Sequence, residues 1–539
     1  MESANADVRS ESRDIRQVIM TRRTLIQSRL KGGSMKKWIT IGFFFLLSAS
    51  LLSQEKFSIS GKATSQISPA KGATVETGKK VLIKEFNRSI RNVLATKFVF
   101  YADCDGIEVQ LEPRDLKNID YDIPTTNDQN WQIIKVKSDL YENLASKGFQ
   151  YDLRRDLEDD TIDLISNFQR YYGLFNDDYL DDYIQGLLYK IHPVTLSDER
   201  PGNLVVRVLQ HSYPNAFSTA TGTIIITTGL LSICRSEDEL LGVLAHEVAH
   251  YVLDHQIVNI NKASERQKRA EFWATLATTM AAASEIYLNA KKEINTGGGI
   301  TLATAVLSTS IADSISERLG AKYSQSQEGE ADIAAIRWLE FMKKDPKVLS
   351  ATLSRIRNYC ILNGDYLALS GSGSHPTLDS RIRAIGIVDP NKYISPKYDR
   401  TISFVNTYNA VNEFALKHLE AALQLANRNI ESGVATEEDY LLKGIVIRTM
   451  YDTVETNQEA LNLIQKAKAI SVMLEYYPEI YKQEGITLLR LGKVDDAINS
   501  FQLYLQKLEG IKDKPQYIID EIIWAKKMIY KIKLKTPSF

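Results

Sequence analysis

The chain has 539 residues, and its 66 Lys and Arg against 67 Asp and Glu leave a formal net charge of -1. At roughly 150 residues per domain this length suggests about three to four units, and the balanced charge excludes a global basic field for nucleic acid. Three cysteines exclude a disulfide framework and a thiolate zinc cluster, so a bound metal would take histidine and carboxylate ligands.

The first 53 residues are predicted to be a leader rather than part of a folded domain. Residues 1–34 are polar without apolar periodicity, and we interpret them as a translation start placed too far upstream. Residues 35–53 begin with Met-Lys-Lys, continue with an apolar run and end near small residues, which is the order of a secretory signal peptide. We therefore expect an exported protein of the periplasm or cell envelope, with an uncleaved membrane anchor as the alternative.

Residues 54–148 are predicted to form a small β-rich or α+β N-terminal region, to which the sequence assigns no role. β-branched and aromatic side chains alternate or cluster in three stretches, at residues 97–101, 107–111 and 131–136. We interpret each stretch as a strand.

The next domain is predicted over residues 150–390 and mixes helices with two strands. Apolar residues at three-to-four spacing between Leu180 and Leu187 indicate a helix, and the runs at 204–209 and 223–228 indicate strands. A further helix is expected to begin after Ser236, because acidic residues fill its first turn.

The C-terminal region, residues 401–539, is predicted to be wholly helical. Six residues fall where a 34-residue tetratricopeptide repeat places its packing residues: Tyr481, Gly485, Leu488, Gly492, Ala497 and Phe501. A weaker copy precedes them, at Tyr440, Gly444, Ile447, Ala460 and Ala467. We expect a tetratricopeptide-like repeat domain, and an irregular helical bundle is the alternative.

The residues with the clearest chemistry are His246, Glu247 and His250, which form an HExxH motif. Side chains four residues apart lie one above the other on a helix, so both imidazoles can reach one metal ion. Glu247 then lies beside the metal, where it can take a proton from bound water.

A zinc site with two histidines lacks one protein ligand, and a later acidic segment offers it. Glu328 and Asp332 share one face of a predicted helix, so Glu328 is the candidate ligand and Asp332 can accept the free N–H of a ligating histidine. Glu330, on another face, is expected to be a solvated acidic side chain. A third element is His375, which precedes a proline and could donate a hydrogen bond to the oxyanion of a tetrahedral intermediate.

The order of these motifs resembles the HtpX and CAAX-protease superfamily of metallopeptidases, family M forty-eight. The resemblance is based on Asn215-Ala-Phe217, the Thr/Ile run, the HExxH motif, the Glu328 segment and His375-Pro-Thr. The signal peptide and the repeat-like tail make the chain more similar to the BepA-like periplasmic branch. The resemblance implies one zinc ion per chain on His246, His250 and Glu328, with Glu247 as general base.

The resemblance also implies roles for residues around the metal. Asp332 and Arg381 would support the ligands, His375 would be either an inhibitory or a transition-state residue, and His255 is interpreted as structural. The strand before the HExxH helix would pair with the substrate backbone, a recognition mode known as strand addition. In this sequence that strand comprises Thr223, Ile224, Ile225, Ile226, Thr227 and Thr228.

Together these features predict an α+β, mainly helical fold: a gluzincin metallopeptidase domain with a small edge-strand sheet, followed by helical repeats. An Ala/Thr/Ser/Gly-rich insert at 272–312 is expected to pack near the active site or touch a membrane rather than span it. The expected function is zinc-dependent hydrolysis of peptide bonds in misfolded or assembling envelope proteins, with the repeats binding clients or outer-membrane assembly partners. The alternatives are a zinc-stabilised scaffold with latent protease activity and an integral membrane protease.

Overall fold

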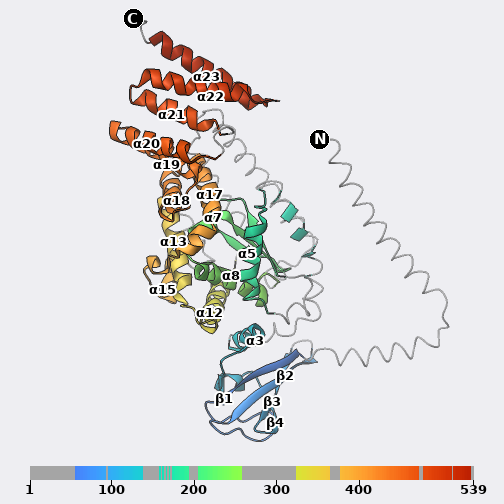
Figure 1. The fold of residues 1–539 in the computed structure, drawn as a ribbon. Coiled ribbons are helices and arrows are strands. Elements are labelled where there is room, and N and C mark those ends of the chain that lie inside the picture. The colour runs from blue at the N-terminus through green and yellow to red at the C-terminus, as the bar shows by residue number, and fades with distance from the viewer. Residues whose placement is uncertain are drawn as a thin grey trace, which may run out of the picture.

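The computed structural model describes residues 55–92, 95–137, 173–193, 204–257, 323–363, 377–472, 477–512 and 514–535, with scattered positions between 154 and 169. The predictions about the leader, about His375 and about the insert at 272–312 lie outside these residues. The described parts follow one another along the molecule as a sheet, a mixed central domain and a stack of helices (Figure 1). None of the described helices is both long and apolar enough to cross a membrane.

The N-terminal region is an antiparallel sheet with the strand order β4-β3-β2-β1-β5. Its strands are β1 (Glu55–Ala63), β2 (Lys80–Asn92), β3 (Ala95–Cys104), β4 (Ile107–Leu111) and β5 (Ile119–Tyr121). Two of the three strands expected from the sequence, at 97–101 and 107–111, are therefore present. One face of the sheet buries a core that includes Ile83, Phe86 and Phe100.

The third expected strand, at 131–136, is wrong, because these residues lie in the helix α3 (Asn127–Lys137). Trp131 and Ile134 pack into the core of the central domain, whereas Ile133 and Val136 pack under the N-terminal sheet. All residues from Asn130 to Val136 are buried, so this helix has no clear exposed face in that stretch, and periodicity alone cannot distinguish its short cluster of apolar residues from a strand. α3 thus joins the sheet to the central domain.

The central domain contains a second sheet of three strands in the order β6-β8-β7. They are β6 (Val205–Leu209), β7 (Ala216–Ser218) and β8 (Thr223–Thr227). β8 lies in the middle, parallel to β6 and antiparallel to β7, and all of its residues are buried.

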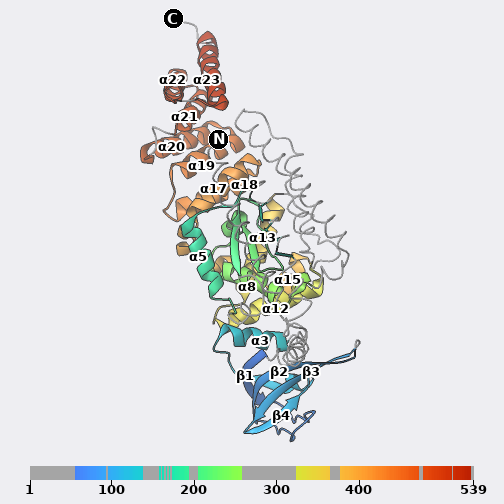
Figure 2. The same cartoon turned by 90° about the vertical axis from the view of Figure 1, so that its right-hand side faces the viewer.

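Helices pack around this sheet and form the main core of the molecule (Figure 2). They are α5 (Asp178–Tyr189), α7 (Thr228–Ile233), α8 (Glu237–Val252), α12 (Gln325–Phe341), α13 (Lys347–Leu362), α15 (Leu378–Ile385) and α16 (Pro396–Thr401). The expected start of α8 is confirmed, since the Ser236 side chain accepts a hydrogen bond from the Glu239 N–H. The expected helix between Leu180 and Leu187 is also confirmed, as α5.

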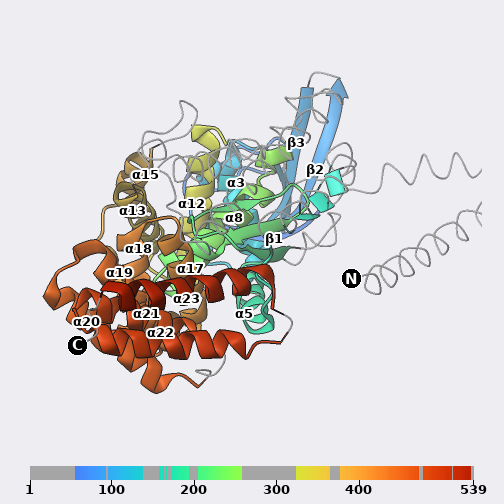
Figure 3. The same cartoon turned by 90° about the horizontal axis from the view of Figure 1, so that it is seen from above.

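The C-terminal region is wholly helical in its described parts, and consecutive helices contact one another. It comprises α17 (Ser403–Ala415), α18 (Leu419–Glu431), α19 (Glu437–Tyr451), α20 (Val454–Ile470), α21 (Glu479–Arg490), α22 (Val494–Glu509) and α23 (Gln516–Lys535). Figure 3 looks along this stack and shows α22 and α23 side by side. Gly444 and Gly485 lie at close contacts between neighbouring helices, where a Cβ would come within 3.1 Å of the Ala460 carbonyl oxygen and 2.7 Å of the Phe501 ring, respectively.

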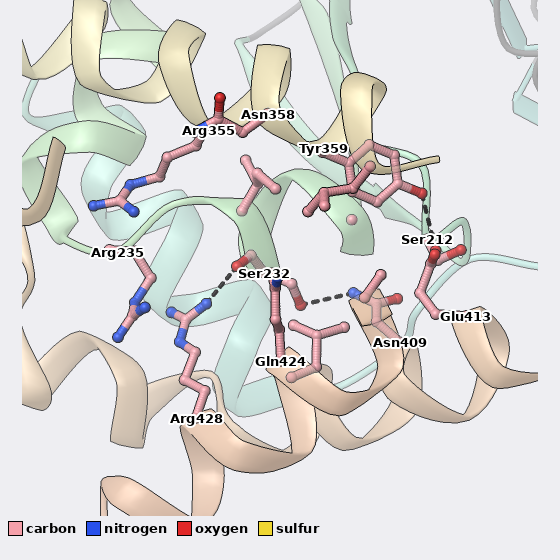
Figure 4. A pocket seen from close by; sticks show the side chains of 15 residues that line it. Ser212, Ser232, Arg235, Arg355, Asn358, Tyr359, Asn409, Glu413, Gln424 and Arg428 are labelled. Atoms are coloured by element: carbon pink, nitrogen blue, oxygen red, sulfur yellow. Dashed lines mark hydrogen bonds between the residues drawn. The ribbon is translucent and has the colours of Figure 1, made fainter. Parts of the chain in front are cut away.

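The stack is joined to the central domain by buried polar contacts around a cavity of about 190 Å³ (Figure 4). The Arg428 guanidinium on α18 donates to the Asp399 carboxylate at 2.8 Å and to the carbonyl oxygens of Ser232 and Cys234. Asn409 on α17 donates to the Ser232 hydroxyl at 2.7 Å. Because these donors and acceptors are buried, the first helices of the stack are held in one position against the central domain.

Candidate metal centre

The structure brings the three expected metal ligands together from two helices. His246 and His250 lie one turn apart on α8, and Glu328 lies in the first turn of α12, which packs against α8. One ligand atom from each residue lies within 4.8 Å of the others. The two Nε2 atoms are 3.1 Å apart, and the Glu328 carboxylate oxygens lie 3.5 Å from His246 Nε2 and 3.7 Å from His250 Nε2.

This donor set fits a zinc ion. Zinc prefers imidazole nitrogens and carboxylate oxygens at about 2.0–2.2 Å in a tetrahedral arrangement, which puts neighbouring ligand atoms roughly 3.3–3.5 Å apart. The separations of 3.1, 3.5 and 3.7 Å are close to that value. All three side chains are buried and converge on one point, so they leave a single position for a metal ion.

Asp332 and Arg381 contact two of these ligands. Asp332 Oδ1 lies 3.0 Å from His246 Nδ1, one helical turn after Glu328. Arg381 donates two hydrogen bonds to Asp332, at 2.9 and 2.7 Å, and its third nitrogen lies 3.0 Å from the Glu328 carboxylate. Burial opposes ionisation of both carboxyl groups, but Arg381 and His246 outweigh it and hold both pKa values well below the usual range.

His255 and Glu330 form a second support that the sequence did not indicate. His255 Nδ1 lies 2.9 Å from His250 Nδ1, and its Nε2 lies 3.1 Å from Glu330 Oε2. Glu330 was expected to be a solvated side chain; it is about 30% exposed, but it also contacts His255, and this hydrogen bond lowers the pKa of its carboxyl group. α8 ends at Val252, and a turn with Asp254 at φ 57° brings His255 back to His250. Helical spacing could not predict that turn, although the clustering of rare histidines was a signal.

Glu247 is buried beside the ligands and contacts the sheet. Burial raises the pKa of its carboxyl group to about 7, and the backbone of Ser218 at the end of β7 forms a hydrogen bond to it. A carboxyl group with a pKa near neutrality can both accept and return a proton at physiological pH. The general-base position expected for Glu247 is thus consistent with its environment.

Tyr323 is a further residue of the site that sequence patterns did not indicate. Its ring stacks on His250, with centroids 3.5 Å apart and planes 16° from parallel. Its hydroxyl lies 3.5 Å from the Ser218 hydroxyl, and the side chain is buried. Tyr323 therefore closes one side of the metal centre and packs against a ligand.

The prediction that residues 223–228 pair with substrate is wrong. β8 has a strand on each side, so its backbone groups are already used within the sheet, and Thr228 belongs to α7. An added strand needs an exposed sheet edge. In the described sheet the two edge strands are β6 and β7, and Ser218, the last residue of β7, contacts Glu247.

Comparison with known proteins identifies the same region of the chain. The family described as Peptidase family M48 matches residues 179–387, which include the metal ligands and Arg381. The mitochondrial metalloendopeptidase OMA1 of Schizosaccharomyces pombe is 31% identical over 93 residues, covering 15% of this chain and 28% of that protein. The Protease HtpX homolog of Campylobacter hominis is 30% identical over 158 residues, covering 29% of this chain and 51% of that protein.

A third relative, OMA1 of Saccharomyces cerevisiae, is 42% identical over 50 residues, covering 9% of this chain and 14% of that protein. The chain thus spans about half the length of one curated relative and less than a third of the other two. The family match and the buried His246, His250 and Glu328 cluster coincide on α8 and α12. Residues 179–387 therefore form a domain of peptidase family M48.

Proposed function

We propose that this chain is a zinc-dependent metalloendopeptidase with one zinc ion held by His246, His250 and Glu328. The observation that carries the proposal is that these three ligands and Glu247 occupy one buried site. The relatives whose names describe metalloendopeptidases and a protease support the same reaction.

The residues of the site have different roles in the proposed hydrolysis. When bound, zinc supplies a Lewis acid that polarises a carbonyl group and lowers the pKa of water. Glu247, with its carboxyl pKa raised to about 7 by burial, takes the proton of the attacking water and returns it to the leaving amine. Asp332 and Arg381 fix the orientation of His246 and balance the charge of Glu328.

An extended peptide would bind along β7, an edge strand of the described sheet, in antiparallel or parallel orientation. Two outward backbone groups of this strand are paired with side chains: Ala216 N–H donates to Asn215, and the Ser218 carbonyl accepts from Gln256. The backbone of a substrate strand would replace these two side chains as the hydrogen-bond partners of Ala216 and Ser218. Because Ser218 also contacts Glu247, a peptide on this edge would lie next to the proposed general base.

The proposed substrates are misfolded or assembling proteins of the cell envelope. The signal-peptide pattern of residues 35–53 supports export, and the helices α17–α23 are suited to client or partner binding because stacked helix pairs present long concave surfaces. We propose that these helices are tetratricopeptide-like repeats, supported by the close helix contacts at Gly444 and Gly485.

The substitution Glu247→Gln tests the proposed activity in the full chain. We expect zinc content to stay at one ion per chain, because Glu247 is not a ligand, and peptide hydrolysis to fall by at least about 10²-fold. Zinc is measured by metal analysis and hydrolysis with an unfolded protein substrate.

The matched control is Glu340→Gln, an exposed glutamate on α12, which should change neither measurement. Undiminished proteolysis by the Glu247→Gln protein would show that Glu247 is not the base.

A further inference from the structure

The last described helix of the stack, α23, has an apolar stripe that faces away from the other described helices. The stripe consists of four residues with exposed fractions of 39% at Ile519, 44% at Ile523, 64% at Tyr530 and 66% at Leu534. At 100° per residue these side chains lie within about 60° of one another around the helix axis. We call this set the outer stripe.

The opposite side of α23 fixes its orientation in the fold. Ile518, Ala525 and Ile532 are buried, and Trp524 packs edge-on against Phe501 of α22 with ring centroids 5.7 Å apart. These buried positions lie roughly 150° from the outer stripe around the axis. The outer stripe is therefore not part of the contact with α22, and in Figures 1 and 2 α23 is the outermost of the labelled helices at this end.

Lysines border the outer stripe on both sides. Lys526 and Lys533 lie at one margin and Lys527 and Lys531 at the other, and all four are exposed. Both acidic residues of α23, Asp520 and Glu521, precede this lysine-rich half.

Those two acidic side chains already have partners elsewhere. Glu521 accepts hydrogen bonds from Lys482 and Tyr504, both at 2.7 Å, and Asp520 accepts from Gln516 at 2.9 Å. Among the lysines, Lys526 lies 2.8 Å from Glu509, in a pair whose side chains are about half exposed. The lysine-rich half of α23 thus presents a positive surface around apolar side chains.

This pattern fits an anionic lipid surface better than a second copy of the chain. The terminal unit of a helical stack needs a polar outer face to remain soluble, whereas an apolar stripe bordered by lysines is typical of a helix that lies in a membrane interface. The lysine stems can extend toward lipid phosphates while the stripe enters the acyl boundary. Two copies packed stripe to stripe would bring their lysine rows together, which is unfavourable.

We propose that α23 binds flat on the surface of an anionic membrane through Ile519, Ile523, Tyr530 and Leu534, with Lys526, Lys527, Lys531 and Lys533 contacting lipid headgroups. This contact would dock the C-terminal end of the stack on the membrane. It is independent of the peptidase reaction, because no residue of the metal centre takes part.

The test uses the full chain with an environment-sensitive fluorophore on the substitution Leu534→Cys, since the three native cysteines are buried. Vesicles of phosphatidylcholine with phosphatidylglycerol should shift the emission to the blue, and vesicles of phosphatidylcholine alone should not. Replacing the four lysines by Gln should weaken the apparent partition coefficient by at least about tenfold, because each lysine near an anionic surface contributes roughly a fivefold gain.

Two controls test whether the fluorescence change reports binding at α23 itself. Exposed lysines of the N-terminal sheet, Lys62, Lys71, Lys79 and Lys80, are replaced by Gln to give the same change in net charge and should leave the emission shift intact. A fluorophore on Lys493→Cys, before α22, should not respond to vesicles, which distinguishes α23 from binding through the apolar run near the N-terminus.

Three outcomes would overturn the proposal. The first is an equal response at residue 534 to neutral and anionic vesicles. The second is an equal effect of the two sets of lysine substitutions. The third is an absent vesicle response together with a dimer in sedimentation that Ile523→Asp dissociates.

Discussion

At the scale of single residues, the metal centre is built from two imidazoles that are each oriented by a carboxylate of α12. Asp332 contacts His246 directly, at 3.0 Å. Glu330 acts on His250 through His255, with contacts of 3.1 and 2.9 Å. Since the hydrogen bond at the distal nitrogen selects the tautomer and the ring orientation, both contacts prepare Nε2 for a metal ion.

The contact through His255 predicts a change in metal affinity. His255→Ala removes the partner of His250 Nδ1, so zinc affinity should fall by about 10–100-fold while the ligands themselves remain. Competition with a chromophoric chelator measures the dissociation constant. His418→Ala, a histidine of the helical stack that pairs with Glu413, should leave the affinity unchanged. Equal affinities for the wild-type and His255→Ala proteins would contradict a positioning role.

Arg381 is predicted to stabilise the folded protein more strongly in the metal-free form than in the zinc-loaded form. Arg381→Met leaves the buried carboxylates of Glu328 and Asp332 without their cation, a change that costs about 3–5 kcal/mol in comparable buried pairs. A bound zinc ion supplies positive charge to the same carboxylates, so the loss should be smaller in the zinc-loaded protein. Denaturant unfolding with chelator and with zinc measures both values. A loss of the same size in both forms would contradict this account.

At the scale of helices and strands, close contacts explain where glycine is needed. A Cβ on Gly485 would lie 2.7 Å from the ring of Phe501, which is fully buried between α21 and α22. Overpacking of this kind usually costs about 1–3 kcal/mol, and the better helix propensity of alanine offsets only part of it.

Gly485→Ala should therefore lower the free energy of unfolding by about 1–2 kcal/mol. Gly186→Ala is the matched control, because Gly186 lies inside α5 and a Cβ added there would meet no atom within 4 Å. That substitution should raise stability by up to about 1 kcal/mol. Thermal unfolding measures the stability of both proteins. A Gly485→Ala protein more stable than the wild type would show that α21 and α22 move apart at little cost to accept the added methyl group.

Some helices and strands could be predicted from local sequence patterns, whereas others depend on contacts with segments distant in the chain. α5 was predictable because its buried residues lie on one face, and α8 because acidic residues of its first turn follow the N-cap Ser236. α3 was not, because two different cores cover it and its apolar residues therefore do not lie on one face. The position of β8 in the middle of its sheet was also not predictable, since strand order depends on pairing between segments distant in the chain.

At the scale of the whole molecule, the helical stack and the central domain share one buried junction. Asp399 on α16 accepts hydrogen bonds from Arg235 at 2.8 Å and from Arg428 on α18 at 2.8 Å. The core of the central domain continues into α17 through Ile402 and Val405. We therefore expect the two regions to unfold together.

Asp399→Asn tests this coupling. It leaves Arg428 buried without a counter-charge, which should cost about 3–5 kcal/mol and separate the single calorimetric transition expected of the wild-type protein into two. Asp452→Asn is the control, because its ion pair with Arg490 is exposed and should contribute at most about 1 kcal/mol. A single transition that persists in the Asp399→Asn protein would show that apolar packing alone couples the regions.

The sequence by itself determined the chemistry of the centre, because His246, Glu247 and His250 lie within one helical turn of each other and need only a helix to converge. It also placed Glu328 and Asp332 on one face of their helix, since that spacing is local. Only the tertiary structure decided which strand lies in the middle of the sheet and how His255, Glu330 and Tyr323 surround His250. These features depend on contacts between separate segments, and neither periodicity nor motif spacing encodes such contacts.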